Sequence, residues 1–276
     1  MEAIKQYQVR GVPGRISRIK IDNRTIDYWA PATPTQHLLV AHDGQNVFDK
    51  KTATHRGKTW EMAQSAIRVS HSLGITPPAI IAIWNSSTEK NPWGRALELS
   101  PQQIFQSGIK AAADVSVPFE IEELNGDQYF VDIVQRYIPE ISSQLKIAIT
   151  PEKSAIIGSS MGALASLYGI GLYPNTFHTC LALSPHWTVS DETFVDALVE
   201  RLPNPGTHKI WMSFGTKGLD RFYGPLQRYA DEAMHRKGYA VGRDFATTVY
   251  PRTGHNEKSW ARYLDDPMKF WLTTLL

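Results

Sequence analysis

The sequence predicts a doubly wound, mostly parallel α/β sheet with helices on both faces. Short apolar runs alternate with longer helical stretches along most of the 276 residues. Several of these runs lack a polar residue at every second position, as expected for strands that are covered by helices on both faces. The regular alternation of the two kinds of segment favours a parallel sheet with crossover helices.

The elements are expected as follows. Residues 16–21 and 25–30 flank the turn signal Asp22-Asn23, which predicts an antiparallel hairpin at a sheet edge. Further strands are expected at residues 37–41, 79–84, 154–157, 178–183, 209–214 and 245–250. Helices are expected at residues 59–73, 127–145, 161–172, 191–201, 223–237 and 259–275. Gly238 follows the fifth helix, where a C-terminal capping glycine is common.

One segment, at about residues 85–125, interrupts this alternation because it holds no clear strand. It carries prolines, aromatic residues and opposite charges: Pro92, Pro101, Pro118, Trp93, Phe105, Phe119, Arg95 and Glu98. Long irregular segments are usually functional or disordered, and the aromatic content argues against disorder. We therefore expect one domain over residues 1–276 with a loop or cap over a pocket. A plain surface insertion is the alternative.

Composition excludes several classes of function. A net charge of +2 is too small to indicate nucleic-acid or membrane-surface binding. No apolar run approaches the roughly 18 residues needed to span a bilayer. The first ten residues lack the apolar core of a signal peptide, so a cytoplasmic location is expected. Cys180 is the single cysteine and stands in an apolar run, which predicts a core residue.

The most informative motif is Gly158-Ser159-Ser160-Met161-Gly162. It joins the strand expected at 154–157 to the helix expected at 161–172, and strand, G-x-S-x-G and helix together are typical of a nucleophile elbow. Only Ser160 has glycines at both the −2 and +2 positions, so Ser160 is the predicted nucleophile of an α/β-hydrolase fold. The sharp turn predicts a strained backbone there. A glycine-rich turn with an incidental serine is the alternative.

A serine nucleophile needs a base, and in this fold the order along the chain is serine, acid, histidine. His255 lies in the loop after the strand expected at 245–250 and is the predicted base. Asp220 is the only carboxylate in the segment after 209–214 and is the predicted acid. The alternatives are a helix-capping role for Asp220, a Ser–His dyad, or another acid: Asp191 or Glu257.

The remaining site predictions concern the oxyanion hole and the pocket. The backbone N–H groups of Met161 and Gln45 are the expected oxyanion donors, with Gly44 allowing the backbone to approach the substrate. Further pocket residues are expected at Trp84, Arg95, His186 and Trp187. His42 and Asp43 resemble metal ligands, but no further His, Asp or Cys cluster accompanies them, so no metal is expected.

Several motifs occur together in a fixed order along residues 37–275. They are His42 to Asp49 (HDGQNVFD), Arg95-x-x-Glu98-x-x-Pro101, Gly126-Asp127-Gln128-Tyr129, the elbow, Leu183-Ser184-Pro185, and Gly254-His255-Asn256-Glu257 with Trp260. This series resembles the "Putative esterase" family of α/β hydrolases. That family includes enterochelin-esterase-like and esterase-D-like enzymes, with the antigen 85 mycolyltransferases as relatives.

The resemblance implies hydrolysis of a small or medium carboxylic ester through an acyl-enzyme, without a metal or organic cofactor. It carries over Ser160 and His255. Relatives often read GTEELD where this chain has Lys217 and Gly218 in place of the two glutamates, while Asp220 is retained. Enterochelin-esterase-like members often carry an N-terminal domain, and the 36 residues before the first core strand predict its absence.

Two other functions use the same scaffold. An acyltransferase would pass the acyl group to a sugar or lipid alcohol, and a binding protein would have lost catalysis. The altered segment before Asp220 is the feature that favours the binding protein. The expected partner is a small-molecule ester, and the sequence leaves the oligomeric state open.

Overall fold

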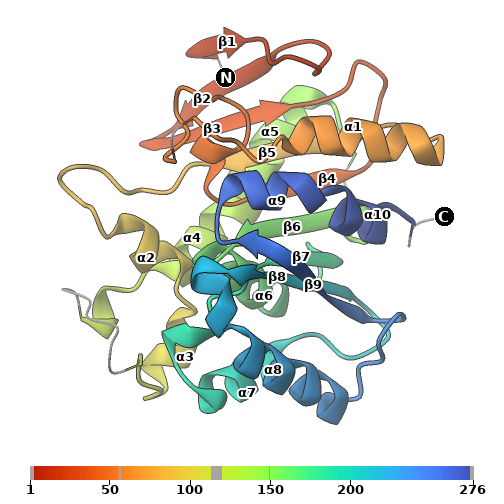
Figure 1. Cartoon of the computed structure of the whole chain (residues 1–276). Coiled ribbons are helices and arrows are strands. Elements are labelled where there is room, and N and C mark those ends of the chain that lie inside the picture. The colour runs from red at the N-terminus through yellow and green to blue at the C-terminus, as the bar shows by residue number, and fades with distance from the viewer. Residues whose placement is uncertain (1–2, 56, 113–119, 149, 274–276) are drawn as a thin grey trace.

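A nine-stranded sheet runs through the protein in the computed structural model, which describes residues 3–55, 57–112, 120–148 and 150–273 (Figure 1). Its spatial order is β1-β2-β3-β5-β4-β6-β7-β8-β9. The strands are β1 (Lys5–Tyr7), β2 (Ile16–Ile21), β3 (Arg24–Trp29), β4 (Leu38–Ala41), β5 (Ala79–Ile83), β6 (Ser154–Ser159), β7 (Thr179–Leu183), β8 (Lys209–Lys217) and β9 (Phe245–Gly254).

The six strands from β5 to β9 pair in parallel, whereas β1, β2 and β3 are antiparallel to their neighbours. The hairpin of β2 and β3 is confirmed, with Ile21 paired to Arg24 across the turn. Its place at the sheet edge was wrong, because β1 pairs outside β2. β1 has only three residues and none is buried, so it leaves no apolar pattern in the sequence.

Most predicted helices are present. They are α1 (Met62–Leu73), α2 (Gly94–Leu99), α3 (Gln102–Gln106), α4 (Gly126–Asp132), α5 (Ile138–Leu145), α6 (Met161–Leu172), α7 (Glu192–Arg201), α8 (Gly224–Lys237), α9 (Glu257–Tyr263) and α10 (Asp265–Thr273). None of the helices in the described residues is long and apolar enough to cross a membrane.

Two predicted helices are subdivided. A π-helical turn at Ile133–Tyr137 separates α4 from α5, and Pro139 stands in the first turn of α5, where the missing N–H costs little. The C-terminal helix is two helices, α9 and α10, and the end of its predicted range lies outside the described residues. Gly238 ends α8 with φ 99°, as predicted.

Helices cover both faces of the sheet because successive strand residues point to opposite sides and both sides are apolar. In β4, Leu38 and Val40 pack with the helices from α3 to α8, and Leu39 and Ala41 pack with α1, α9 and α10. Figure 1 shows these two layers around the sheet. The strands therefore lack polar residues at alternate positions because helices cover both of their faces, as the sequence suggested.

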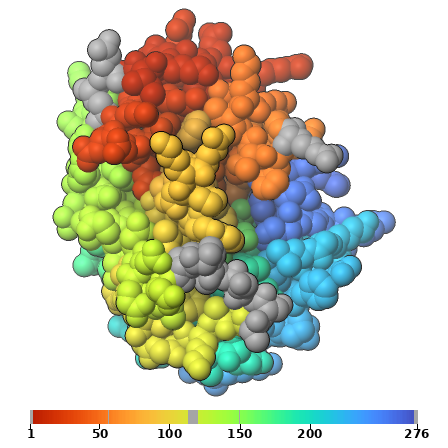
Figure 2. Space-filling view, turned by 90° about the vertical axis from the view of Figure 1, so that its left-hand side faces the viewer, coloured from red at the N-terminus to blue at the C-terminus, as the bar shows by residue number. Residues whose placement is uncertain are grey.

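The segment 85–125 holds α2, α3 and a 3₁₀ turn at Ile121–Glu123, while residues 113–119, which include Pro118 and Phe119, lie outside the described residues. In Figure 2 its amber and yellow surface runs down one face of the molecule, beside the orange surface of the chain around residue 50. Arg95 and Glu98 do not pair with each other. Arg95 pairs with Asp43 and Glu98 with Arg24, so two ion pairs fasten α2 to the sheet.

The sheet order places a crevice at the carboxyl ends of β4 and β6. The chain moves to one side of the sheet from β4 to β5, and to the other side from β6 onward. Ligands of open α/β sheets bind at such a switch point, outside the carboxyl ends of the strands. The loops after β4, β5, β6, β8 and β9 all open on this edge.

Candidate active site

Ser160 occupies the turn between β6 and α6 with φ 57° and ψ −124°, a strained conformation for a residue with a side chain. The strain predicted for the elbow is present. A Cβ at Gly158 would lie 2.1 Å from the carbonyl oxygen of Gly162, so only glycine fits there. A Cβ at Gly162 would come no closer than 3.4 Å, to His42. Steric contacts therefore require glycine at position 158 but leave room for a side-chain carbon at position 162.

Asp220 is fully buried and lies beside His255, with Oδ1 2.6 Å from the imidazole Nδ1. Its other oxygen, Oδ2, accepts hydrogen bonds from the Ser184 hydroxyl at 2.9 Å and from the Gly215 N–H at 2.7 Å. The side chain makes no capping bond to α8. Three donors thus fix the orientation of this carboxylate.

The rival acids have partners other than His255 in the described part of the chain. Asp191 caps α7 by accepting from the N–H of Thr193. Glu257 is buried and its Oε1 lies 2.8 Å from Nδ1 of His55. Asp220 is therefore the acid whose geometry matches the prediction.

The ring of His255 is held between two aromatic side chains. Trp260 lies edge-on at 5.1 Å between centroids and Tyr223 at 5.7 Å. Trp260 also donates its indole N–H to the Ser184 hydroxyl, which links it to the partner of Asp220. Tyr223 was missed from the sequence, because a tyrosine at a helix start gives no catalytic signal. Ser184 belonged to a recognised motif, but its bond to the acid could not be inferred.

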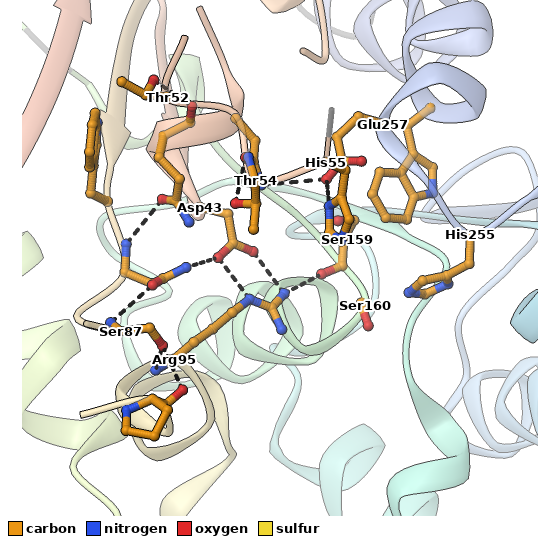
Figure 3. A pocket seen from close by; sticks show the side chains of 16 residues that line it. Asp43, Thr52, Thr54, His55, Ser87, Arg95, Ser159, Ser160, His255 and Glu257 are labelled. Carbon is orange, nitrogen blue, oxygen red and sulfur yellow. Dashed lines mark hydrogen bonds and ion pairs between the residues drawn. The ribbon is translucent and has the colours of Figure 1, made fainter. Parts of the chain in front are cut away.

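Ser160 and His255 line a common pocket of about 570 Å³. Figure 3 shows the imidazole across from the Ser160 side chain. Trp84 and Arg95, which were expected in the pocket, also line it, and so does Gln45, the expected oxyanion donor. Most of its lining residues are polar, among them threonine, asparagine and serine residues from the loops after β4 and β5.

Three residues that were expected in the pocket lie outside it. Gly44 is buried, and a Cβ there would lie 2.3 Å from the Ala82 carbonyl, so the glycine lets the loop pack on β5 rather than approach a substrate. Trp187 is buried and donates its indole N–H to Gln227. His186 lies beside Tyr223, with Nδ1 2.6 Å from its hydroxyl. None of the three lines the pocket.

Arg95 lines the pocket but is not a free cation. Its guanidinium donates two hydrogen bonds of 2.8 Å to the buried carboxylate of Asp43, as Figure 3 shows. Burial alone would raise the pKa of Asp43, but the charge and hydrogen bonds of Arg95 hold it below its usual value. Arg95 also donates to the Ser159 carbonyl at 3.4 Å. It therefore connects the 85–125 segment to the residue before Ser160.

Two backbone donors stand at the carboxyl ends of β4 and β6. Gln45 lies in a 3₁₀ turn at Gly44–Asn46, which Asp43 enters with φ 54°. Met161 is the first residue of α6, whose N-terminus carries partial positive charge. Neither N–H donates a hydrogen bond within the described residues. Both remain available to an anionic ligand atom.

His42 lies behind the elbow and is fully buried, with Nδ1 2.8 Å from the Tyr129 hydroxyl. Burial lowers the pKa of His42 to about 4. The ring is therefore neutral near pH 7.

The sheet order, the strained turn at Ser160 and the position of the pocket define a protein with the α/β-hydrolase fold. The sequence profile of the family described as "Putative esterase" matches residues 120–270, more than half of the chain. The chain belongs to this family.

Known proteins share this fold. The chain is 28% identical over 217 residues to YbbA, an uncharacterized protein of Bacillus subtilis strain 168, covering 74% of this chain and 72% of YbbA. The enterobactin esterase FES from Shigella flexneri superposes with a TM-score of 0.66 at 15% identity over 97% of this chain, which spans only 61% of that enzyme. An S-formylglutathione hydrolase from Agrobacterium tumefaciens gives a TM-score of 0.62 at 13% identity over the whole of both chains.

Proposed function

We propose that this chain is a serine hydrolase that cleaves a small or medium carboxylic ester through an acyl-enzyme. The observation that carries the proposal is the strained Ser160 on the wall of a pocket shared with His255, whose ring is bound to a fully buried Asp220. Membership of an esterase family supports ester hydrolysis. The family and the fold support the reaction class, and the pocket of about 570 Å³ supports a substrate of small or medium size.

In the proposed acylation step, Ser160 Oγ bonds to the ester carbonyl carbon while its proton passes to Nε2 of His255. Asp220 accepts the Nδ1–H of the ring, which keeps Nε2 free as the base and stabilises the imidazolium. The N–H groups of Met161 and Gln45 donate to the carbonyl oxygen as it becomes an oxyanion. The imidazolium then protonates the leaving alkoxide as the ester C–O bond breaks.

In the proposed deacylation step, His255 takes a proton from water, whose oxygen bonds to the acyl carbon. The C–Oγ bond then breaks, the proton returns to Ser160, and the carboxylic acid leaves. The protein supplies the base, the fixed histidine tautomer and the oxyanion donors. Removing one oxyanion donor typically lowers kcat by roughly 10²- to 10³-fold.

The contacts of Asp220 weaken the case for a binding protein. That alternative depended on the missing glutamates at positions 217 and 218, and the buried Asp220 already supplies a carboxylate to His255. An acyltransferase would use the same residues and differ only in the acceptor. Added alcohols during turnover separate the two, because a transferase yields a new ester in place of the acid.

The proposal is tested with p-nitrophenyl acetate and butyrate. Wild type should turn over both esters, Ser160→Ala should lose activity by at least roughly 10⁴-fold, and a fluorophosphonate should label wild type but not Ser160→Ala. Ser159→Ala is the matched control and should retain labelling. Enterobactin and S-formylglutathione, which appear in the names of two structural neighbours, extend the panel. Equal rates for wild type and Ser160→Ala would refute the proposal.

A further inference from the structure

A second groove adjoins the active-site pocket at His255. It has a volume of about 610 Å³ and is lined by the ends of β8 and β9, the 3₁₀ turn after β8, and α9. Four of its lining residues are cations: Lys217, Arg252, Lys258 and Arg262. Among the described residues that line it there is no carboxylate. We call it the basic groove, and His255 lines both this groove and the pocket that contains Ser160.

The first two cations are held by the ends of β8 and β9. Lys217 is the last residue of β8 and pairs with Gly254 after a shift in register. Arg252 has φ 63°, which is uncommon for a residue with a side chain, and its backbone N–H donates to the Thr216 hydroxyl at 2.8 Å. The pairing of the two strands therefore fixes where both side chains leave the backbone.

The other two cations lie on α9, the helix that follows the base. Lys258 and Arg262 have the i, i+4 spacing, which places two side chains on one face of a helix. The next cavity along α9 shares both residues and adds Lys50 and Lys58, but its lining also includes the carboxylate of Glu61. The basic groove is therefore the part of this surface whose described lining has no counter-charge.

None of the four cations of the basic groove forms an ion pair within the described residues, and all four are exposed. Two carboxylates close to them in sequence are unavailable. Asp220 is fully buried and bound to His255, and Glu257 is buried and bound to His55. Because the four charges have the same sign and no partner, an anion that enters the groove is attracted by all of them.

The pocket on the Ser160 side has no free arginine or lysine among its described lining residues. Arg95 lines it, but its guanidinium is bound to the carboxylate of Asp43 by two hydrogen bonds. The other carboxylate in the pocket lining belongs to Glu257. His255 therefore lies at the boundary between a pocket without a free arginine or lysine and a groove with four such cations.

The proposed mechanism determines which part of an ester can reach the basic groove. The acyl carbon must lie at Oγ of Ser160 and its carbonyl oxygen at the N–H of Gln45, and both residues line the pocket but not the groove. The leaving alkoxide must lie within hydrogen-bonding reach of Nε2 of His255, because the imidazolium protonates it. His255 also lines the groove, so the alcohol part of the ester extends into it.

We propose that the basic groove binds an anionic group, a carboxylate or a phosphate, on the alcohol part of the ester. Both lysines and both arginines attract this group, and each arginine can donate two hydrogen bonds to its oxygens. The substrate is then an ester of a negatively charged alcohol, with its acyl part in the pocket. This inference rests on the proposed function and specifies its substrate class.

Two sets of esters place the charge on different sides of the scissile bond. In the first set the leaving group carries a carboxylate (p-butyryloxybenzoate) or a phosphate (p-butyryloxyphenyl phosphate), and p-acetamidophenyl butyrate is the neutral reference. In the second set the acyl part carries the charge (mono-p-nitrophenyl adipate), and p-nitrophenyl hexanoate is the reference. The measured quantity is the ratio of kcat/KM for the charged ester to kcat/KM for its reference. Comparison of this ratio between proteins cancels the intrinsic reactivity of the esters.

The test variant replaces all four cations of the basic groove with glutamine: Lys217→Gln, Arg252→Gln, Lys258→Gln and Arg262→Gln. At low salt we expect the leaving-group ratio to fall by roughly 10-fold or more, because a cleft of one charge sign raises the association rate of its counter-ion by about 10- to 10³-fold. The acyl-part ratio should stay the same. Added NaCl should lower the leaving-group ratio of wild type toward that of the variant. The larger of the two leaving-group ratios shows whether a carboxylate or a phosphate fits the groove.

A matched control removes two lysines and two arginines from exposed positions that line neither the pocket nor the groove: Arg10→Gln, Arg15→Gln, Lys20→Gln and Lys269→Gln. This control has the same net charge as the groove variant and should keep both wild-type ratios. All substituted side chains are exposed in both variants, so both should fold, and thermal unfolding verifies this. A further readout needs no catalysis: the affinity of Ser160→Ala for p-hydroxyphenyl phosphate, measured by calorimetry, should weaken when the four groove cations are replaced.

The inference is overturned if the groove variant keeps the wild-type ratio for both anionic leaving groups, the result also expected if the groove served a macromolecule. It is also overturned if the acyl-part ratio falls instead, or if the control variant loses as much as the groove variant. Hydrolysis of the neutral ester by Ser160→Ala at the wild-type rate would instead refute the proposed function. The two failures are therefore distinguishable.

Discussion

Asp220→Asn replaces one carboxylate oxygen with an NH₂ group and leaves the volume almost unchanged. The direction of the new amide is dictated by its neighbours. The Ser184 hydroxyl and the Gly215 N–H both donate to the Oδ2 side, so the amide oxygen must face them. The NH₂ group then faces Nδ1 of His255, 2.6 Å away in the native contact.

That orientation reverses the tautomer of His255. An NH₂ group donates, so Nδ1 must accept and the ring proton moves to Nε2, the nitrogen that should receive the Ser160 proton. The base is then blocked in its ground state and its imidazolium loses the adjacent negative charge. An Asp→Asn change of this kind lowers kcat by about 10⁴-fold, equivalent to about 5 kcal/mol of barrier.

The measurement is kcat for p-nitrophenyl butyrate from pH 6 to 10, with thermal unfolding beside it. We expect the 10⁴-fold loss near pH 7, while the variant remains folded because both donors on the Oδ2 side keep an acceptor. Asp220→Ala serves as a control that leaves those donors unpaired, and it should unfold at a lower temperature. If Asp220→Asn retains activity within tenfold of wild type, the chain uses a Ser–His dyad and the assignment of Asp220 is wrong.

Two further predictions concern stability. Gly158→Ala should destabilise the fold by roughly 3 kcal/mol, because its Cβ meets a backbone oxygen at 2.1 Å, whereas Gly162→Ala should cost far less; denaturant midpoints compare the two, and equal losses would contradict the argument. The pKa of His42 is about 4 in the folded protein and near 6.5 when unfolded, so the unfolded state binds the proton first and stability falls as pH drops from about 6.5 to 4. Between pH 7 and 4.5 this costs roughly 2 to 3 kcal/mol, and the pH dependence of unfolding should be weaker by that amount in His42→Asn.

The strands of the parallel sheet could be predicted because each is an apolar run flanked by turn residues. β1 could not, since three partly exposed residues carry no such pattern and pair only because β2 is already in place. The break between α9 and α10 was also hidden, because the apolar spacing continues across it. The contacts of the surrounding core, rather than local preference, set these features.

For the site too, residues at fixed places next to strands could be predicted, whereas residues that act through tertiary contacts could not. Ser160, His255 and Asp220 stand at fixed positions relative to strands, so sequence order sufficed to propose them. Gly44 was misinterpreted because a glycine beside a substrate and a glycine beside another strand have the same appearance in a sequence. Tyr223 and Ser184 gain their roles only through three-dimensional contacts with His255, His186 and Asp220.

The two ion pairs that hold α2 in place make the shape of the pocket rim independent of the geometry at the pocket base. Residues 87–92 are held from both sides, because Arg95 and Glu98 after them pair with Asp43 and Arg24, and the Asn85 amide before them donates to Asp43. Residues 87–92 form part of the rim, with Ser87 and Pro92 facing the cavity. Substitutions or insertions there can reshape what the pocket admits while the turn at Ser160 keeps its geometry. Such a scaffold can acquire new substrates in evolution without rebuilding its chemistry.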